Sequence, residues 1–435
     1  MLRALVDRIR AQSGGRALLA LVGGTAMAQV ITLASTPILS RLYGPAAMGE
    51  LGLFAAFLGV AGLLVTARYE LAIPGARDEA DAALLLRLSM RLAVILSIAS
   101  ALALVVLRAR AWLTFELLPW WAALVAVPAL IAFGWFSALR YWHLRRRDYD
   151  GIARVVVVQS GGRAIASIGL GMVSGSSAGL LAGEVIGRVL GVTRLLSRLR
   201  LDESWRASAG RPTGETASRH RSFPALLLPS GLLDVLALSL PVPLISSTYG
   251  VAAAGTFLMV QRLSLLPAAL VAGGAGDVLH VGIVEALAAG GGAARALLGR
   301  AALRLLGAAL VVFLPAAALA PWGLPRFLGP AWVTATPLFL ALLPWSAANL
   351  VVSPLSRVLA VSDRKHLKLV YDVVALGALV GATLFGARAG WGLTTTIAFV
   401  GALQVVAYAL YFALIRAACP PARADGAVPP LVTPE

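Results

Sequence analysis

Long runs of apolar residues recur along the whole chain of 435 residues, separated by short polar stretches. About 20 consecutive apolar residues, wound as a helix, are enough to cross the hydrocarbon core of a bilayer. Backbone in lipid must satisfy its own hydrogen bonds, so we expect these runs to be helices. The predicted membrane-spanning segments are 17–40, 50–67, 84–107, 117–139, 152–173, 177–198, 223–247, 252–276, 297–320, 334–356, 367–387 and 391–415.

The composition excludes a soluble globular protein. Hydrophobic residues make up 59% of the chain and charged residues 13%, with a mean hydropathy of +0.86. Soluble domains carry roughly 25% charged residues, so this chain has too little polar surface to cover a water-soluble particle. We therefore predict an all-α integral membrane protein with about twelve transmembrane helices.

The net charge of +17 could suggest binding to nucleic acid, but the cations lie between the apolar runs, where they set membrane topology. The cation-rich regions are the N-terminus and the alternate connections 68–87, 140–154, 188–221, 295–304, 357–368 and 416–423. The opposite connections hold only Arg41, Arg108, Arg110, Arg326 and Arg388. The positive-inside rule therefore predicts that both termini are cytoplasmic, and we expect no nucleic-acid partner.

An internal repeat divides the predicted helices into two sets of six. Residues 37–49 align without gaps with residues 243–255, and seven positions are identical at a constant offset of 206. Both copies join the first two helices of a set on the same side of the membrane, which indicates a parallel repeat. The predicted parts are an amphipathic N-terminal segment (1–16), a first bundle (17–200), a cytoplasmic linker (201–222), a second bundle (223–416) and a disordered cytoplasmic tail (417–435).

The chain lacks the residue patterns of an enzyme or a metalloprotein. Its single cysteine, Cys419, excludes a disulfide framework and a CxxC metal site, and its four histidines have no metal-ligand spacing. No nucleophile motif, phosphate-binding loop or ATP-binding motif occurs. We therefore expect no catalytic residue, no metal and no cofactor.

Charged residues inside apolar segments are the remaining functional candidates. An arginine near the bilayer centre costs roughly 2.5–3.5 kcal/mol to insert, so it normally faces a cavity or a partner. Arg163 lies near the middle of its segment, with Glu184 at a similar depth in the next, and Arg262 and Asp234 form a second couple of this kind. These arginines either attract an anionic substrate or are neutralised by their acidic neighbours, and the sequence leaves both alternatives open.

Several short motifs resemble a known family. They are Gly-Thr-Ala-Met-Ala-Gln at 24–29, Pro-Ile-Leu-Ser-Arg-Leu-Tyr-Gly-Pro at 37–45, Arg-Tyr-Glu-Leu-Ala-Ile at 68–73, Phe-Pro at 223–224, Pro-Ser at 229–230, Tyr-Gly at 249–250 and Gln-Arg at 261–262. In order and spacing along the whole chain they resemble the oligosaccharide flippase branch of the multidrug/oligosaccharidyl-lipid/polysaccharide exporter superfamily.

This resemblance implies two six-helix bundles around a central cavity that work by alternating access. It implies a cargo of sugar repeat units on undecaprenyl diphosphate, moved from the cytoplasmic to the periplasmic leaflet of the bacterial inner membrane for synthesis of surface polysaccharide, such as O-antigen of lipopolysaccharide or exopolysaccharide. The expected partners are the lipid-linked oligosaccharide, membrane lipids, a polysaccharide polymerase and glycosyltransferases.

A diphosphate cannot cross hydrocarbon without polar partners, so a cationic passage is expected. The candidates for binding the diphosphate are Arg163, Arg262 and Arg68. Glu70 could instead pair directly with Arg68. The energy source is open, since a proton or sodium gradient could drive transport. The candidates for ion coupling or charge pairing are Glu184, Asp234, Asp372 and Glu70.

Two departures from related families bear on the function. Drug/cation antiporters place an acidic residue in the first bundle for ion coupling, but the first segment, 17–40, has none. Lipid II flippases carry two further C-terminal helices. A drug/cation antiporter of the same fold is the alternative function. A membrane-embedded polysaccharide polymerase is a further alternative, although all predicted non-cytoplasmic connections are short.

Overall fold

The computed structural model describes residues 15–199, 202–268, 291–356 and 366–419. Within these ranges the chain is helical and contains no strand, which confirms the predicted all-α membrane fold. Most of the predicted N-terminal segment 1–16 and of the predicted tail 417–435 lies outside the described residues.

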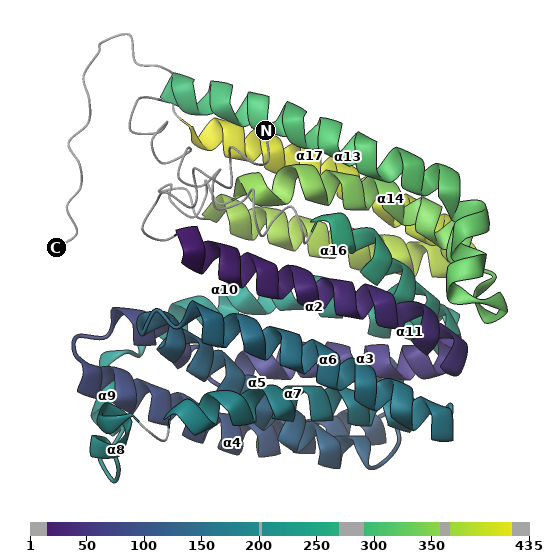
Figure 1. Cartoon of the computed structure of the whole chain (residues 1–435). Coiled ribbons are helices and arrows are strands. Elements are labelled where there is room, and N and C mark those ends of the chain that lie inside the picture. Colours follow the sequence, from purple (N-terminus) through teal and green to yellow (C-terminus); the bar gives the residue numbers. More distant parts are fainter. Residues whose placement is uncertain (1–14, 200–201, 269–290, 357–365, 420–435) are drawn as a thin grey trace. The chain divides into compact units, whose positions relative to one another are not determined.

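Figure 1 shows the helices in chain order. The first are α2 (Gly15–Leu42), α3 (Pro45–Leu64), η1 (Tyr69–Gly75), α4 (Glu79–Ala109), η2 (Trp112–Leu117), α5 (Ala122–Arg145), α6 (Tyr149–Val173), α7 (Ser177–Leu199), α8 (Glu203–Ala207) and α9 (Gly214–Arg219), where η marks a 3₁₀ helix. They are followed by α10 (Ser222–Ser239), α11 (Pro241–Tyr249), a helix over Val251–Ala268, α13 (Gly291–Leu328), η3 (Pro330–Trp332), α14 (Ala335–Val352), η4 (Ser353–Ser356), α16 (His366–Arg388) and α17 (Leu393–Ala418).

Among the described residues, 11 helices are long and apolar enough to span a membrane, and each matches one predicted segment. The remaining predicted segment, 177–198, forms α7, which is of sufficient length but carries Glu184, Arg188 and Arg194. Because of these charges α7 is not counted among the 11 apolar helices, although it packs against α5 and α6, which are. A fold of about twelve membrane helices is therefore present.

One predicted segment is not a single helix. Segment 223–247 divides into α10, which ends at Ser239, and α11, which begins at Pro241. Proline has no N–H to continue the hydrogen bonding of α10, but its fixed φ suits the first turn of a new helix. By contrast, segment 152–173 forms the continuous helix α6 although it contains Gly161 and Gly162.

Packing divides the chain into two compact units. Unit 1 comprises Met1–Met259 and Phe327–Trp332, and unit 2 comprises Val260–Arg326 and Val333–Glu435. In unit 1, α6 packs against α7 and α2, and α4 packs against α5; in unit 2, α17 packs against α14 and α16. The predicted division into bundles at 17–200 and 223–416, and the central cavity, stay predictions.

Four glycines bring α6 and α7 into close contact. Gly179, Gly183, Gly187 and Gly191 recur every fourth residue and so lie along one face of α7. A methyl group on Gly187 would lie 2.7 Å from the backbone oxygen of Gln159 in α6. Small residues at this spacing let membrane helices approach until their backbones touch. We call this row the glycine seam.

The first copy of the repeat is anchored to α6. Tyr43 is fully buried, and its hydroxyl donates a hydrogen bond to the backbone oxygen of Ser167 at 2.7 Å. A methyl group on Gly171 would lie 2.8 Å from the Tyr43 ring, so this glycine makes room for the aromatic side chain. The tyrosine of the repeat therefore holds the end of α2 against α6.

The predicted linker 201–222 is attached to the helix ends of unit 1. Asp81, at the start of α4, pairs with Arg219 at 3.2 Å and with His220 at 3.1 Å. Asp202, which caps α8, pairs with Arg146 at 3.0 Å. Burial raises the pKa of Asp202, but hydrogen bonds from the first turn of α8 and the charge of Arg146 outweigh it and hold that pKa below its ordinary value. The described part of the linker is thus fixed at both ends by ion pairs.

Candidate functional site

A polar cavity of about 200 Å³ lies between α5, α6 and α7 within unit 1. Helix α5 contributes aromatic rings, and α6 and α7 contribute the polar and charged groups. The lining residues are Phe133, Phe136, Val156, Gln159, Ser160, Arg163, Glu184 and Arg188. We call this cavity the arginine pocket.

Two arginines share one carboxylate in the arginine pocket. Glu184, whose side chain is 8% exposed, accepts hydrogen bonds on Oε1 from Arg188 Nε at 3.1 Å and Nη2 at 2.8 Å. Arg163 Nη1 lies 3.5 Å from the other oxygen, Oε2. Arg163 also donates to Thr32 Oγ1 of α2 at 3.3 Å. The predicted couple of Arg163 and Glu184 is therefore present, with Arg188 as a second cation.

The three charges leave one positive charge in excess. Arg188 is held at short distance from Glu184, and its guanidinium lies 5.2 Å from the centre of the Phe133 ring. Arg163 makes longer contacts, and 36% of its side chain is exposed. A guanidinium can bind phosphate through two parallel N–H donors. An anion entering the pocket would therefore meet Arg163, while Arg188 neutralises Glu184.

The glycine seam positions these groups. Glu184 and Arg188 are four residues apart in α7, on the same face as Gly187, so that they form an ion pair within the helix. A methyl group on Gly187 would lie 2.7 Å from Arg163 Cβ. The backbone of α7 thus passes beside Arg163 closely enough for charges on two helices to meet.

Arg68 and Glu70 lie outside the arginine pocket, just after α3. The chain turns at Ala67 and Arg68, which have positive φ angles of 49° and 64°. The Arg68 guanidinium reaches α10, where a methyl group on Gly231 would lie 2.5 Å from Arg68 Nη2. Arg68 Nε and Glu70 Oε2 are buried without a hydrogen-bond partner. The direct ion pair that the sequence leaves open is therefore absent from this structure.

Glu70 lies in η1, in the connection between two membrane spans, and is 2% exposed. Burial raises the pKa of Glu70 above its ordinary value. Hydrogen bonds from Thr66 and Ser137 and the charge of Arg68 act in the opposite direction but do not outweigh burial. The fold therefore favours the protonated form of this carboxyl group.

The other predicted site residues lie elsewhere. Asp372 is buried in α16 and pairs with Lys368, one turn earlier in the same helix, at 2.7 Å. Asp234 belongs to α10 in unit 1, and Arg262 belongs to the part of its helix that falls in unit 2. Asp372 is thus charge-paired within its own helix, and the couple of Arg262 and Asp234 stays a prediction.

Arg188 was not among the predicted site residues. The predicted segment 177–198 contains Arg188, but the count of cations assigns this residue to the cytoplasmic connection 188–221. In the structure Arg188 lies within α7 and lines the arginine pocket. The signal that could have identified it is its position four residues after Glu184, the separation at which opposite charges pair on one face of a helix.

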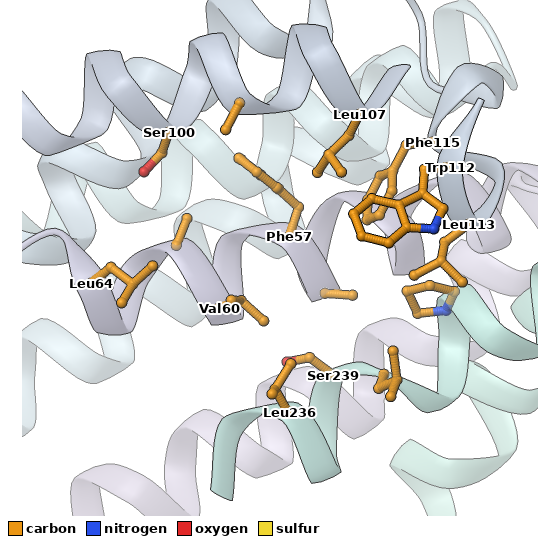
Figure 2. A pocket seen from close by; sticks show the side chains of 15 residues that line it. Phe57, Val60, Leu64, Ser100, Leu107, Trp112, Leu113, Phe115, Leu236 and Ser239 are labelled. Carbon is orange, nitrogen blue, oxygen red and sulfur yellow. The ribbon is translucent and has the colours of Figure 1, made fainter. Parts of the chain in front are cut away.

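A second cavity in unit 1, of about 360 Å³, is apolar. Figure 2 shows its walls, which come from α3, α4, η2 and α10 and include Phe57, Leu107, Trp112, Phe115 and Leu236. Its lining offers hydrocarbon contacts and no charged group, so this cavity does not suit a diphosphate.

No family model and no curated protein match the chain. Solved structures do match it. An inward-facing multidrug resistance MATE family transporter of the MOP superfamily aligns with a TM-score of 0.68 at 15% identity, over 90% of this chain and 94% of that chain. Lipid II flippase MurJ in an inward closed conformation aligns with a TM-score of 0.67 at 13% identity, over 91% and 86%. A MOP superfamily transporter from Pyrococcus furiosus aligns with a TM-score of 0.63 at 15% identity, over 95% and 97%.

The chain shares the fold of these solved structures, which we call the MOP fold. This likeness covers nearly the whole of each structure, and it agrees with the predicted fold of about twelve helices. At such low identity the MOP fold carries no information about cargo, because one fold hosts many functions.

Proposed function

We propose that this chain is a membrane transporter that moves oligosaccharides linked to undecaprenyl diphosphate from the cytoplasmic to the periplasmic leaflet by alternating access. The observation that carries the proposal is the arginine pocket, where two arginines and one glutamate leave a positive charge among membrane helices. The MOP fold supports a transporter, because the solved structures with this fold include a drug transporter and a lipid II flippase.

The chemistry of the pocket suits a phosphorylated sugar. The guanidinium of Arg163 offers donors to phosphate oxygens, and Gln159 and Ser160 offer hydrogen bonds to hydroxyl groups. Phe133 and Phe136 present apolar surfaces suited to the C–H face of a sugar ring. A volume of about 200 Å³ is too small for a whole oligosaccharide, so the pocket would hold the diphosphate or the first sugar. The lipid tail would stay in the bilayer.

A drug/cation antiporter is the alternative, since a multidrug transporter has the same fold. A cationic drug needs an acidic group that is free to pair with it. Glu184 already faces Arg163 and Arg188, so the arginine pocket disfavours a cation. The bacterial inner membrane, cytoplasmic termini, and cooperation with a polymerase and glycosyltransferases belong to the same proposal.

Complementation of a deletion strain tests the proposal. Arg163→Ala should lower the rate of surface polysaccharide formation by about 10-fold to 100-fold, the loss expected for one charge-assisted contact of about 1.5–3 kcal/mol, and lipid-linked sugar should accumulate in the cytoplasmic leaflet. Arg163→Lys should be intermediate, because an ammonium lacks the guanidinium fork. Arg154→Ala is the matched control, since Arg154 is exposed on the same helix outside the pocket.

Membrane levels of each variant are measured in parallel. Full polysaccharide formation by Arg163→Ala would remove the role of the pocket. A deletion strain with normal polysaccharide and increased sensitivity to cationic drugs would favour the antiporter.

A further inference from the structure

The apolar cavity of unit 1 is elongated along the helices that form it. In Figure 2, Leu64 and Ser100 lie at one end of the cavity, and Trp112 and Phe115 lie at the other. Ser100 and Leu107 both line the cavity and are seven residues apart in α4, so it extends for about 10 Å along that helix. Its volume of about 360 Å³ falls within the range of cavities that bind small molecules. The shape therefore suits a length of hydrocarbon chain.

Small side chains leave this space open. The lining includes Ala56 and Ala61 from α3 and Ala103 from α4, where larger side chains would fill the cavity. Of the 15 lining residues, none is charged and the two with hydroxyl groups are serines. A hydrocarbon ligand loses nothing against such a wall, whereas a polar ligand would lose its hydrogen bonds to water. The lining therefore selects an apolar occupant.

The wall of the cavity on α4 reaches the lipid-facing surface of unit 1. Ala103 lines the cavity and is itself exposed. Leu102 and Val106, beside it on α4, have exposed fractions of 62% and 58%. Large apolar side chains that are exposed on a membrane-spanning helix face lipid tails. A lipid chain therefore reaches the cavity sideways from the bilayer without passing through water.

The 3₁₀ helix η2 closes one end of the cavity with aromatic rings. Leu113 and Thr114 have positive φ angles of 51° and 61°, a conformation that residues with a Cβ atom adopt at a cost. This turn brings Trp112 and Leu113 into the lining. The Phe115 ring packs edge-to-face against Phe57 of α3, with 6.4 Å between the ring centres. The backbone strain of η2 is thus associated with the aromatic end of the cavity.

The same end of the cavity carries positive charge. Arg108 and Arg110 stand at the end of α4, between Leu107 and Trp112, which both line the cavity. They are two of the five arginines in the cation-poor connections, on the predicted periplasmic side. Glu116 of η2 balances one of them, so this end retains one positive charge. Arg110 is exposed, which leaves its guanidinium accessible to an anion.

Exposed tryptophans indicate that this end lies at the membrane surface. Trp112 has an exposed fraction of 65%, and Trp120, in the same connection, of 73%. Such rings collect where the bilayer meets water. The cavity then lies in the hydrocarbon of the predicted periplasmic leaflet, and Arg110 lies at the level of the headgroups. An apolar cavity below a cation is complementary to an amphiphile with a phosphate at the end of its chain.

We propose that the apolar cavity binds the isoprenoid chain of the lipid carrier in the periplasmic leaflet, with the diphosphate at Arg110. This site rests on the proposed function for the identity of the carrier. The arginine pocket holds the head group during transport, and the apolar cavity holds part of the chain once the head group has crossed. The rest of the chain stays in the bilayer.

Photo-crosslinking tests the site. The purified protein is placed in liposomes with undecaprenyl diphosphate that carries a diazirine in its isoprenoid chain, and labelled peptides are identified by mass spectrometry. Label should fall within 56–64 and 100–107. Val60→Phe and Ala103→Phe fill the cavity from α3 and α4 and should lower this labelling by about 5-fold or more. Ala99→Phe, exposed on α4 outside the cavity, should leave it unchanged. Equal labelling in all three variants would overturn the site.

Competition in the wild type does not depend on how the variants fold. Excess unlabelled undecaprenyl diphosphate should lower the labelling by about 5-fold or more, and the same excess of phosphatidylglycerol should have little effect. Equal displacement by both lipids would mean that ordinary membrane lipid fills the cavity, and would overturn the proposal. Arg110→Ala should weaken displacement by undecaprenyl diphosphate but not by the uncharged alcohol undecaprenol. Unchanged displacement by the diphosphate would remove Arg110 from the site.

Transport of lipid-linked oligosaccharide, measured in the same liposomes, separates this site from the proposed function. Labelling of the cavity without transport would keep the site and contradict the flippase. Transport without labelling of the cavity would keep the flippase and overturn the site. Arg163→Ala should lower transport and leave the labelling unchanged, because Arg163 lines the other pocket.

Discussion

Glu184 is the residue on which the geometry of the arginine pocket depends, because both Arg163 and Arg188 contact its carboxylate. Arg188 uses two donors on one oxygen, and Arg163 approaches the other. Removing the negative charge would leave two guanidinium groups facing each other on adjacent helices. The pocket is therefore organised by its anion, although its net charge is positive.

Glu184→Gln should lower the free energy of unfolding by about 1–3 kcal/mol. Loss of one partner of a fully buried ion pair costs about 3–5 kcal/mol, and the partial exposure of Arg163 reduces this through solvent screening. Thermal unfolding in detergent measures the effect. The double variant Glu184→Gln with Arg188→Gln should regain part of the stability, since it restores a single positive charge. A stable single variant with no rescue would contradict this view of the pocket.

Glu70 should make stability depend on pH. Its raised native pKa means that the folded protein holds the proton more tightly than the unfolded chain. This contribution is fully present below the ordinary carboxyl pKa of about 4.3 and is lost as pH rises through the native pKa. The thermal stability of the wild type relative to Glu70→Gln should therefore fall as the pH rises above about 4.3. Parallel profiles for the two proteins would show that burial does not favour the protonated carboxyl.

At the residue scale, the sequence was informative where pairing follows from depth and spacing. It placed Arg163 and Glu184 at similar depth on consecutive helices, and the structure joins them. The sequence could not show whether Arg68 pairs with Glu70. The chain turns at Ala67 and Arg68 with positive φ angles, the guanidinium lies beside α10, and neither residue type predicts such a turn.

Close backbone contact joins some helices of the fold, and α6 with α7 is the clearest case. The spacing of glycines along α7 is readable from the sequence as a row of small residues every fourth position. The helix against which the row packs is not readable, since that depends on the path of the chain. The division of segment 223–247 at Pro241 was readable in principle, because proline ends the hydrogen bonding of the preceding helix.

Gly187→Ala and Gly169→Ala form a matched pair that tests the glycine seam. Both changes favour a helix by about 1 kcal/mol through backbone entropy. At Gly169 nothing lies within 4 Å of the added methyl group, so this variant should be as stable as the wild type or more stable. At Gly187 the methyl group meets the backbone of α6, and overpacking should lower stability by about 1–3 kcal/mol. Relative to the wild type, the unfolding temperature in detergent should fall for Gly187→Ala and should stay the same or rise for Gly169→Ala. A rise for both variants would mean that α6 and α7 are not in close contact.

At the scale of the whole molecule, composition, apolar length and the offset of 206 are enough to predict a membrane fold of about twelve helices with an internal repeat. The MOP fold agrees with this prediction. The two copies of the repeat also contact each other in unit 1, since a methyl group on Gly49 would overlap the backbone oxygen of Val251 and one on Gly255 that of Pro45. A linear pattern cannot show such a contact. Cargo is the part that neither pattern nor fold specifies, since it depends on the shape and charge of a cavity.

Transport of a lipid-linked oligosaccharide by the purified protein tests the central proposal most directly. The protein is reconstituted in liposomes that carry a fluorescent polyprenyl diphosphate oligosaccharide in both leaflets, and an impermeant glycosidase reports how much of it reaches the outer leaflet. The wild type and Arg154→Ala should expose the inner pool at least 10 times faster than protein-free liposomes, and Arg163→Ala should stay close to the protein-free rate. A wild-type rate equal to that of protein-free liposomes, or an Arg163→Ala rate equal to that of the wild type, would contradict the proposal.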